Sequence, residues 1–573
     1  MLVAERSDLP VSAVEDGHHL LSDLHLNSIM VGQLVAESCR RLGLPPPVAP
    51  THYADATVAE VADALMDLER TGGSEPSAER GRLPAGVDGW VRSFTIELVE
   101  RPRPPQHPPE CAGRWQVLAP PGHPLADRLA RVFAEEGRGS GITVCLPPEP
   151  DEGSVGLLLD AARAALAAGA GTRFVLVQHG GGGSAFARSL HLEEPGIATC
   201  VVDVPPDHPE VASWVVAEAG AASGFTEAHY DAAGRRREPV LRLLPIEELP
   251  AAPILGPADV LLVTGGGKGI AAESALALAR ESGCRLALIG RSRPTLDAEL
   301  TANLDRFEAA GITFRYLAAD VTDADEVADA VREAERGLGP ITAILHGAGA
   351  NAPQRLASLD APAFLRTLAP KVRGARNLLA AVDPDRLRLF VTFGSIIART
   401  GLHGEADYAT ANEWLTRLAG RFAAEHPSCR CLAVEWSVWS GVGMGERLGT
   451  VEALARDGIM PIPPGRGIAI LRDLVARSLP TLSVVVTGRF GSVPTLRSEP
   501  REYPFLRFLE RPRVDIPGVE LVVDVELATD TDPYLDDHVF RGERLFPAVL
   551  GLEAMVQVAR TLAGDAELGA AKK

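Results

Sequence analysis

The pattern that most limits the fold of this chain is an alternation of short β-rich runs with helical runs, which extends from residue 88 to about residue 490. Typical strand-like runs are RWQVLAP, ITVCLP and RFVLVQH, and a typical helical run is SVGLLLDAARAALAAG. Strands that alternate with helices in this way form parallel sheets with helices on their faces. The sequence therefore predicts an α/β protein built around two Rossmann-like subdomains.

The two α/β units resemble an internal duplication. EEPGIATCVVDV (193–204) aligns without gaps with EHPSCRCLAVEW (425–436), and each carries an acidic residue eight positions after its proline. In the first unit, the turn after RWQVLAP is PPGHPLADRL, whose single glycine cannot let backbone amides close around a pyrophosphate. We therefore expect residues 88–255 to be a degenerate, structural subdomain and residues 256–490 to bind a nucleotide.

Four further segments flank these units. Residues 1–70 contain two amphipathic runs and predict a small helical domain. Residues 71–87 are rich in Gly, Pro, Ser and charge, and residues 491–517 are rich in Pro, so both are assigned as linkers. The last segment, 518–573, has the pattern of a strand, a loop and a helix.

The bulk composition excludes several functions. A net charge of −20 argues against nucleic acid or an anionic membrane as a partner. No apolar span is long enough to cross a bilayer, and the N-terminus has no signal-peptide core. The seven cysteines show neither a C-x-x-C pair nor metal-finger spacing. We expect a cytoplasmic protein with reduced thiols and no bound metal.

One glycine-rich turn lies between a strand-like run and a helical run, in LLVTGGGKGIAAESALALA. Small residues let the backbone approach phosphates, and the start of the helix supplies free N–H groups. The predicted cofactor-binding residues of this turn are Gly265, Gly266, Gly267, Lys268, Gly269 and Ile270. The alternative is a tight strand-to-helix corner that binds nothing.

The ends of the following strands add further candidates. Arg291 and Ser292 follow the next strand, where an arginine favours a ribose phosphate, so NADPH is predicted over NADH. Asp320 and Val321 close the strand after that and are expected to hold adenine. The HGAGA turn adds Gly347, Ala348 and Gly349.

Lysine is scarce, with only four in the chain, and two of these are the last two residues. Because arginine carries almost all the positive charge, the internal Lys268 and Lys371 mark positions where a compact ammonium that can shift a neighbour's pKa is useful. The alternative is that two lysines persist in a sequence biased towards arginine.

The stretch FGSIIARTGLHGEADYATAN combines a strand end with a helix start. Ser395 is predicted at the carboxyl end of a strand, and Tyr408 and Asn412 on one face of the following helix. A tyrosine with a pKa near 10 is a poor acid at neutral pH, and the Lys371 ammonium is expected to lower that pKa. Asp407 is expected to point to solvent. The alternative is a capping serine and a core tyrosine.

Taken together, these motifs and the WSVWSGVGM loop (436–444) resemble the ketoreductase domain of type I polyketide synthases, a member of the short-chain dehydrogenase/reductase superfamily. The resemblance covers residues 88–490. Most of the superfamily carries Tyr-x-x-x-Lys, whereas this chain carries Tyr-x-x-x-Asn with its lysine upstream, as polyketide ketoreductases do. The Leu-Asp-Asp motif and the tryptophan that mark hydroxyl stereochemistry in the family are both missing, so stereochemistry is not assigned.

The resemblance implies NADPH-dependent reduction of a β-ketoacyl thioester on an acyl carrier protein to a β-hydroxyacyl thioester. Tyr408 would give a proton to the carbonyl oxygen, and Ser395 would hydrogen-bond the same oxygen. Lys371 would lower the tyrosine pKa and contact the nicotinamide ribose. Asn412 would hold a water or the lysine in the proton relay.

The flanks also resemble polyketide synthase parts. LLSDLHLNSIMVGQLV resembles a carrier protein around Ser28, the expected 4′-phosphopantetheine attachment site, although Asn27 departs from the usual Asp and a helix N-cap is the alternative role for Ser28. His538-VFR-Gly542-ERLF-Pro547 resembles the first catalytic segment of a hot-dog dehydratase, or is simply a surface histidine. Because the partner aspartate lies downstream in that family, no dehydration by this polypeptide alone is expected.

The order carrier, ketoreductase, dehydratase is most like iterative enediyne-type synthases. The expected partners are the other synthase domains: ketosynthase, acyltransferase and the remainder of the dehydratase. Two alternatives are a non-catalytic scaffold or carrier segment and a free-standing reductase of small alcohols.

Overall fold

The computed structural model describes most of the 573-residue chain. The described residues are 2–7, 9–10, 13–20, 23–24, 26, 28–42, 56–70, 89–105, 114–136, 139–449, 451–456, 458–491, 493–499, 503 and 506–563. The chain divides into two compact units, of which the first contains Met1–Pro239 and Pro245–Leu496 and the second contains Val240–Leu244 and Arg497–Lys573. The predicted linker 71–87 lies outside the described residues.

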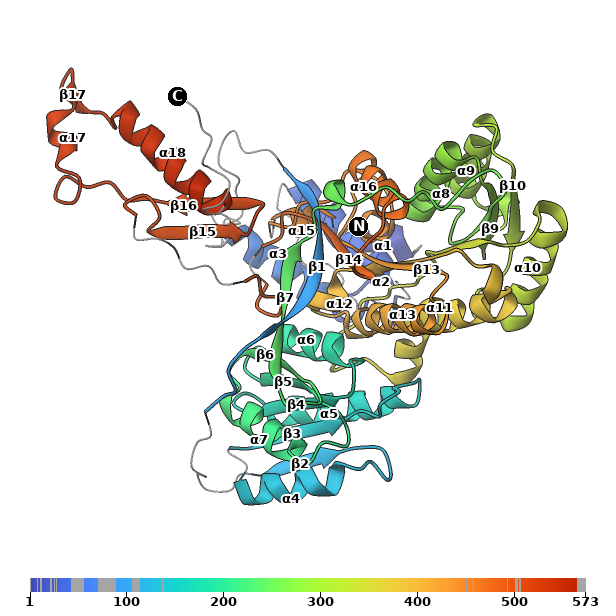
Figure 1. Cartoon of the computed structure of the whole chain (residues 1–573), viewed down its shortest axis with the longest axis horizontal. Helices are drawn as coiled ribbons and strands as arrows, with labels where there is room; N and C mark the ends of the chain where they lie inside the picture. The colour runs from blue at the N-terminus through green and yellow to red at the C-terminus, as the bar shows by residue number, and fades with distance from the viewer. Residues whose placement is uncertain are drawn as a thin grey trace. The chain divides into compact units, whose positions relative to one another are not determined.

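A 14-stranded sheet of order β10-β9-β8-β11-β12-β13-β14-β1-β7-β6-β5-β4-β3-β2 organises the α/β part (Figure 1). One half of it is parallel and contains β8 (Val260–Thr264), β9 (Arg285–Gly290), β10 (Phe314–Ala318), β11 (Ala343–His346), β12 (Leu389–Ser395), β13 (Arg430–Trp436) and β14 (Ser483–Gly488). The parallel strands of the other half are β2 (Trp115–Leu118), β3 (Gly141–Cys145), β4 (Arg173–Gln178), β5 (Ala198–Asp203) and β6 (Phe225–Tyr230). Two long strands join the halves, β1 (Val91–Glu100) antiparallel to β14 and β7 (Arg236–Leu243) antiparallel to β6.

The two halves differ in strand order, and this difference decides where a ligand can bind. In the β8–β14 half, the chain runs outward from β8 to β10 and then returns to β11 on the other side of β8. The loops after β8 and β11 therefore diverge and leave a crevice at the carboxyl ends of the strands. In the other half, β2 to β6 follow one another in chain order, so the sheet has no such switch point. The predicted division into one nucleotide-binding and one structural half has a topological basis.

Helices cover the faces of this sheet. The β8–β14 half carries α8 (Gly269–Ser282), α9 (Ala298–Ala309), α10 (Ala324–Leu338), α11 (Ala361–Ala381), α12 (Ile397–Thr400), α13 (Ala406–Glu425), α14 (Met444–Leu448), α15 (Val451–Arg456) and α16 (Pro464–Ala476). The other half carries α4 (Ala126–Glu136), α5 (Ser154–Ala168), α6 (Ser184–Glu193) and α7 (Val211–Ala221). Short 3₁₀ turns lie at Ile246–Glu248, Pro294–Leu296 and Pro384–Arg386. Among the described residues, no helix is both long and apolar enough to cross a bilayer.

One apolar core is shared by the two halves. Leu158 of α5 and Phe186 of α6 belong to the same buried cluster as Phe364 of α11 and Trp414 of α13. The rings of Phe186 and Phe364 lie 6.4 Å apart, within the range of favourable aromatic pairs. Because burial of apolar surface is the main driving force of folding, the halves are held together as one body by α5, α6, α11 and α13.

The N-terminal segment contains α1 (Leu2–Ser7), α2 (Ser28–Leu42) and α3 (Val58–Arg70), so the two predicted helical runs are confirmed. Their apolar faces meet in a small core that includes Leu20, Leu26, Val31 and Leu34. Whether this segment is a carrier domain stays a prediction.

The second unit contains two short antiparallel pairs, β15 (Arg511–Ile516) with β16 (Glu520–Asp524) and β17 (Val539–Phe540) with β18 (Glu543–Arg544), and the helices α17 (Tyr534–Asp537) and α18 (Ala548–Ala563). Strand β15 falls within the predicted linker 491–517. Its Pro512 made the segment resemble a linker, but a two-stranded pair tolerates proline, and the register shifts between Pro512 and Val514. The hot-dog fold stays a prediction.

The glycines of α16 offer a test of this packing. A Cβ at Gly467 would overlap the indole ring of the buried Trp439, whereas a Cβ at Gly465 would meet no atom within 4 Å. Gly467→Ala is expected to lower stability by about 1–3 kcal/mol through overpacking. Gly465→Ala in the same helix is expected to be neutral or slightly stabilising. Thermal unfolding of both variants measures this, and equal midpoints for the two would contradict the packing described.

Candidate active site

A cavity of about 850 Å³ opens at the switch point, at the carboxyl ends of β8, β11 and β12. Most of the predicted site residues line it. These are Gly265, Gly267, Lys268, Ile270, Arg291, Ser292, Asp320, Val321, Gly347, Ala348, Gly349, Lys371, Ser395 and Tyr408. The structure thus brings together residues that are up to 143 positions apart in sequence, from Gly265 to Tyr408.

The glycine-rich turn joins β8 to α8. Gly265 and Gly269 have φ angles of 67° and 59°, a region that residues with a side chain rarely adopt. A Cβ at Gly266 would lie 2.8 Å from Val263, and one at Gly267 would overlap Leu300. Packing inside the chain therefore accounts for part of the glycine pattern.

The start of α8 supports ligand binding more directly than the glycines do. Its N-cap residue, Lys268, has an extended backbone conformation. The Lys268 side chain makes no capping hydrogen bond to the first N–H groups of α8. The first N–H groups of a helix have no partner within the helix and carry a positive partial charge. Since Lys268 and Ile270 line the cavity, this helix start lies at the cavity wall and fits an anionic group.

Lys268 has a partner in the protein. Its Nζ lies 2.6 Å from Oδ2 of Asp297, whose other oxygen accepts a hydrogen bond from the N–H of Leu300 and caps α9. The Lys268 ammonium holds the pKa of Asp297 down, to about 2. Lys268 therefore neither faces solvent alone nor is free for a phosphate while this pair holds.

Arg291 has more freedom. Its side chain is 68% exposed, and its guanidinium reaches only to 4.0 Å from the carboxylate of Asp320. The neighbouring Ser292 is fixed by its carbonyl oxygen, which accepts a hydrogen bond of 2.6 Å from the hydroxyl of Tyr316. An exposed arginine at a fixed strand end is suited to meet a phosphate.

Lys371 is buried beside Tyr408, as the sequence predicted. Only 3% of its surface is exposed, and its Nζ donates a hydrogen bond of 2.9 Å to the carbonyl of Phe393 at the end of β12. The same Nζ lies 5.4 Å from the centre of the Tyr408 ring. Burial lowers the pKa of Lys371 to about 8, so the lysine still carries its charge at neutral pH.

His346 of the HGAGA turn supports Lys371, and sequence reasoning did not single it out. Its Nδ1 lies 2.8 Å from Oγ1 of Thr264, and its Nε2 lies 2.9 Å from the backbone carbonyl of Lys371. Burial and the Lys371 charge lower the pKa of His346 to about 4. A neutral, fully buried imidazole thus links β8, β11 and α11 behind the lysine.

Asn412 and Ser395 flank the tyrosine. The Nδ2 of Asn412 donates a hydrogen bond of 2.7 Å to the backbone carbonyl of Tyr408, one turn earlier in α13. Its Oδ1 is buried and accepts no hydrogen bond from the described residues. Ser395 ends β12, where its Oγ lies 3.4 Å from the N–H of Ile397. The predicted strand end and helix face are both confirmed.

The predicted effect on the tyrosine pKa is wrong. Burial raises the pKa of Tyr408, the Glu405 carboxyl raises it further, and a hydrogen bond from Asn412 opposes them only in part. Lys371 lies over the ring and its Nζ is engaged with the Phe393 carbonyl, so its charge does not offset the burial. The prediction failed because the burial of Tyr408, which removes water from its hydroxyl, could not be read from the sequence.

Asp407 was also predicted wrongly. It is 1% exposed rather than facing solvent, and its Oδ1 accepts a hydrogen bond of 2.8 Å from the N–H of Tyr408. It also bonds the side chain of Thr367 in α11, and burial raises the pKa of Asp407 to about 6. These two bonds hold Asp407 inward, and the free N–H groups of the first helix turn favour a carboxylate there.

Several lining residues were missed. Glu405 is buried at the start of α13, and its Oε2 accepts a hydrogen bond of 3.0 Å from Nδ2 of Asn351. Burial raises the pKa of Glu405 to about 8. Because Glu405 lies three residues before Tyr408, the sequence alone could have marked it as a candidate site residue. Phe490, Val493 and Pro494 also line the cavity, from the end of the predicted domain and its supposed linker.

Of the other predicted site residues, Gly266, Gly269 and Asn412 do not line the cavity, and Ser28 and His538 come from the flanking segments. Ser28 begins α2, as a carrier serine would, but its side chain and Asn27 lie outside the described part of the chain. His538 belongs to the second unit, is exposed, and has its Nδ1 3.1 Å from the carbonyl of Leu545.

Comparison with known proteins identifies the β8–β13 region. Residues 260–441 match the family model described as the KR domain. The chain is 32% identical over 218 residues to polyketide synthase GfsA of Streptomyces halstedii and 31% identical over 238 residues to a phenolphthiocerol/phthiocerol polyketide synthase of Mycobacterium tuberculosis. The matches cover 38% and 39% of this chain but only 3% and 13% of those relatives, so the chain spans a small part of their length.

Solved structures agree on the fold. A ketoreductase domain from the bacillaene assembly line has a TM-score of 0.58 at 18% identity, with 70% of this chain and 98% of that chain covered. A structure of A-type ketoreductases from a modular polyketide synthase has a TM-score of 0.57 at 23% identity, with 69% and 92% covered. Residues 260–441 therefore match the KR domain, and the fold is that of ketoreductase domains from polyketide synthases.

Proposed function

We propose that this chain reduces a β-ketoacyl thioester, carried by an acyl carrier protein, to the β-hydroxyacyl thioester with NADPH. The observation that carries the proposal is the meeting of Lys371 and Tyr408 in a cavity that is also lined by the start of α8, where no side chain caps the helix. A proton donor and a site for an anionic dinucleotide next to one another are what carbonyl reduction needs.

The residues of the cavity fit NADPH. The start of α8 and the Gly265 turn would hold the pyrophosphate, and Arg291 would hold the ribose phosphate. Asp320 and Val321 would border the adenine, and the 347–349 turn would border the nicotinamide half. When bound, NADPH supplies the hydride that is added to the carbonyl carbon. Ketoreductase domains of the short-chain dehydrogenase/reductase superfamily use this cofactor, which supports the assignment.

The chain's own residues would handle the carbonyl oxygen. As the carbon–oxygen π pair moves onto oxygen, the Tyr408 hydroxyl transfers its proton there, and Ser395 donates a hydrogen bond to the same oxygen. The Lys371 ammonium, charged at neutral pH, stabilises the tyrosinate that remains. Asn412, whose buried Oδ1 has an unused acceptor among the described residues, would hold the water or lysine that returns the proton.

The catalytic interpretation is favoured over a scaffold by the KR match and by the presence of Lys371, Ser395 and Tyr408 in one cavity, with Asn412 bonded to the Tyr408 carbonyl. A scaffold would show no change in NADPH fluorescence and no turnover. A free-standing reductase of small alcohols fits less well, because the relatives are polyketide synthases much longer than this chain.

The flanking assignments rest on one helix start and one sequence pattern. The start of α2 at Ser28 supports phosphopantetheine attachment there, and the His-x-x-x-Gly-x-x-x-x-Pro pattern from His538 to Pro547 supports a dehydratase segment. Both, together with the enediyne-type order and the ketosynthase and acyltransferase partners, are proposed on the resemblance.

Tyr408→Phe tests the function. The change keeps the ring and its packing but removes the proton donor, so kcat for reduction of a β-ketoacyl thioester should fall by about 10²-fold or more. NADPH binding should not change, because the tyrosine hydroxyl is not part of the predicted nucleotide contacts. Mass spectrometry of the thioester after incubation with NADPH follows the gain of two hydrogens. A Phe variant as active as the wild type would contradict the proposed role.

Arg291→Ala tests the cofactor. Loss of a charge-assisted contact to the ribose phosphate should weaken NADPH binding by about 10- to 100-fold and leave NADH binding almost unchanged. Arg293→Ala is the matched control, because Arg293 is exposed two residues away and does not line the cavity. Fluorescence titration with both nucleotides measures the constants. An equal loss for NADH and NADPH would show that Arg291 does not read the phosphate.

Glu405 makes stability depend on pH. Its pKa is about 8 in the folded chain, above the value of about 4.3 for an unfolded glutamate, so the folded state binds a proton that the unfolded state has lost. Stability from this group is complete below the unfolded pKa and is lost as pH rises towards 8. Glu405→Gln cannot lose that proton, so it should gain stability over the wild type between about pH 5 and about pH 8.

The measurement is the thermal midpoint of both proteins across that range. Glu425→Gln, at the exposed end of the same helix, is the control and should follow the wild type at every pH. Parallel curves for wild type and Glu405→Gln would mean that Glu405 is ionised in the folded chain.

A further inference from the structure

A second glycine-rich loop, HGGGGS (179–184), lies between β4 and α6 in the structural half. Three of its glycines have φ angles of 77°, 93° and 111° and are therefore in conformations that favour glycine. Such a loop at a helix start turns its N–H groups to one side and is suited to hold an anion. A glycine-rich turn was expected in the other half alone, so this loop corrects that prediction.

The protein's own side chains occupy this loop. The N–H of Gly180 donates a hydrogen bond of 2.7 Å to Oδ1 of Asp203, and the N–H of Gly183 donates one of 3.0 Å to Oε1 of Gln178. Both acceptors come from the ends of neighbouring strands of the structural half. The loop is thus already filled by internal acceptors and needs no phosphate.

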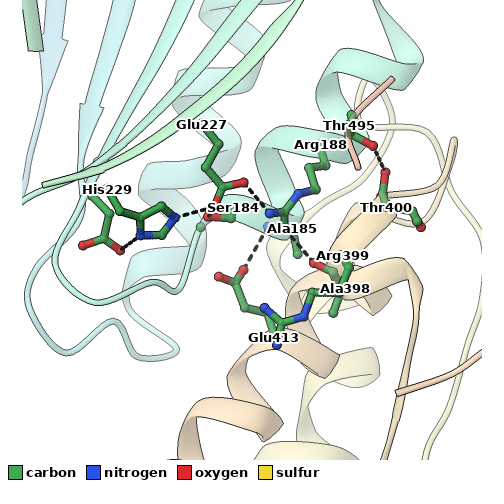
Figure 2. Close-up of polar contacts among 12 residues, drawn as sticks. Ser184, Ala185, Arg188, Glu227, His229, Ala398, Arg399, Thr400, Glu413 and Thr495 are labelled. Atoms are coloured by element: carbon green, nitrogen blue, oxygen red, sulfur yellow. Dashed lines mark hydrogen bonds and ion pairs between the residues drawn. The ribbon is translucent and has the colours of Figure 1, made fainter. Parts of the chain in front are cut away.

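The main occupant is Glu413, which comes from α13 of the other half. Its Oε1 accepts a hydrogen bond of 2.8 Å from the N–H of Gly182, and its Oε2 accepts one of 2.9 Å from the N–H of Ala185. Figure 2 shows the carboxylate pointing at Ala185 from the helix below. Only 8% of Glu413 is exposed, so these charge-assisted bonds are shielded from water and are of the stronger kind.

Two further side chains of α13 bind the same loop. The indole N–H of Trp414 donates a hydrogen bond of 2.7 Å to the carbonyl of Gly182, and Arg417 donates to the carbonyl of Gly181. The loop therefore donates N–H groups to Glu413 and offers carbonyl oxygens to Trp414 and Arg417. Its contact with α13 extends over more than one helical turn. This contact fixes both the rotation and the axial position of the helix.

The rotation of α13 also decides where the proton donor lies. Glu413 follows Asn412 directly and lies five residues after Tyr408, which places it about 140° around the helix from the tyrosine. Tyr408 faces the cavity, whereas Glu413 faces the loop. Any rotation of the helix about its axis would move both groups together.

Helix α6 holds the serine-bearing segment as well. Arg188 donates a hydrogen bond of 2.8 Å from Nη1 to the carbonyl of Ala398, in the short helix that follows Ser395, and also forms a buried ion pair with Glu227 (Figure 2). The N–H of Leu402 donates a bond of 3.3 Å to Oγ of Ser189. Helix α6 of the structural half thus contacts two parts of the site. It bonds the segment that follows Ser395, and through Ala185 it bonds α13, which carries Tyr408.

We propose that Glu413 is a positioning residue for the reduction: bound in the 180–185 loop, its carboxylate sets the orientation of α13 and so places the Tyr408 hydroxyl against the substrate carbonyl. The inference rests on the proposed reduction. It gives the structural half a part in the rate of the reaction beyond the cavity wall that its Leu192 supplies.

The choice of variant follows from the geometry. Glu413→Gln keeps the length and shape of the side chain but turns one oxygen into an NH₂ group, which meets an N–H donor of the loop and breaks one of the two bonds. Glu413→Ala removes both. Glu149→Gln is the matched control, because it breaks an ion pair with Arg421 that also joins α13 to the structural half, at an exposed site.

The experiment measures kcat and KM of the full chain with a β-ketoacyl thioester, together with NADPH affinity by fluorescence. For Glu413→Gln, kcat should fall by about 10-fold or more, as expected when a catalytic group is misplaced by a fraction of an ångström. NADPH affinity should stay within about twofold, because the β8–α8 turn is untouched, and Glu149→Gln should match the wild type in both. Glu413→Gln with wild-type kcat, or with kcat and NADPH affinity lost together, would overturn the proposal.

Hydrogen exchange gives a readout that does not need turnover. Residues 406–413 should exchange faster in Glu413→Gln than in the wild type, while residues 265–275 should exchange at the same rate. Unchanged exchange in 406–413 would overturn the proposal. A wild-type chain that binds NADPH but reduces no ketone would instead refute the proposed function, and exchange would then decide the role of Glu413 alone. If Glu413→Ala does not fold, Glu413→Gln still decides.

Discussion

The packing of helix α13 between the two sheet halves is the constraint on which the rest of the site depends. One of its faces carries Tyr408 to the cavity, and Trp414 enters the core shared with α5 and α6. Because protein interiors are close-packed, a helix held in this way cannot rotate without opening voids in that core. The position of the tyrosine is therefore set by residues that never meet the ligand, and the site is only as well ordered as the contact between the halves.

The two glycine-rich loops show how similar local structures can serve different uses. Each half has a strand followed by a glycine-rich loop and a helix, at Gly265 in one and at Gly180 in the other. In the first case the strand lies at a switch point, so the loop faces a cavity and the helix start stays uncapped by side chains. In the second the strands run in chain order, no crevice forms, and Asp203 and Glu413 take the N–H groups. Strand order, rather than the glycines themselves, decides whether such a loop binds a ligand.

The sequence was sufficient for the parts of the site that depend on local pattern. The strand before Gly265, the strand end at Ser395 and the helix with Tyr408 and Asn412 follow from periodicity and spacing, and the structure confirms them. The family resemblance linked Lys371 to Tyr408, although they lie on different helices. The predictions that were wrong are those that depend on burial. Asp407 and the Tyr408 pKa were misjudged because no spacing rule tells which face of a helix start another helix covers.

Burial also gives the site its charge balance. His346 is neutral because it is enclosed beside a cation, and Glu405, with a pKa near 8, holds its proton at neutral pH. Lys371 keeps its positive charge, and its ammonium donates a hydrogen bond to a neutral carbonyl. A positive charge in a shielded site acts strongly on any negative charge that develops nearby. A tyrosine that gives up its proton there becomes such a charge, and Lys371 lies beside it, although burial leaves the Tyr408 pKa raised overall.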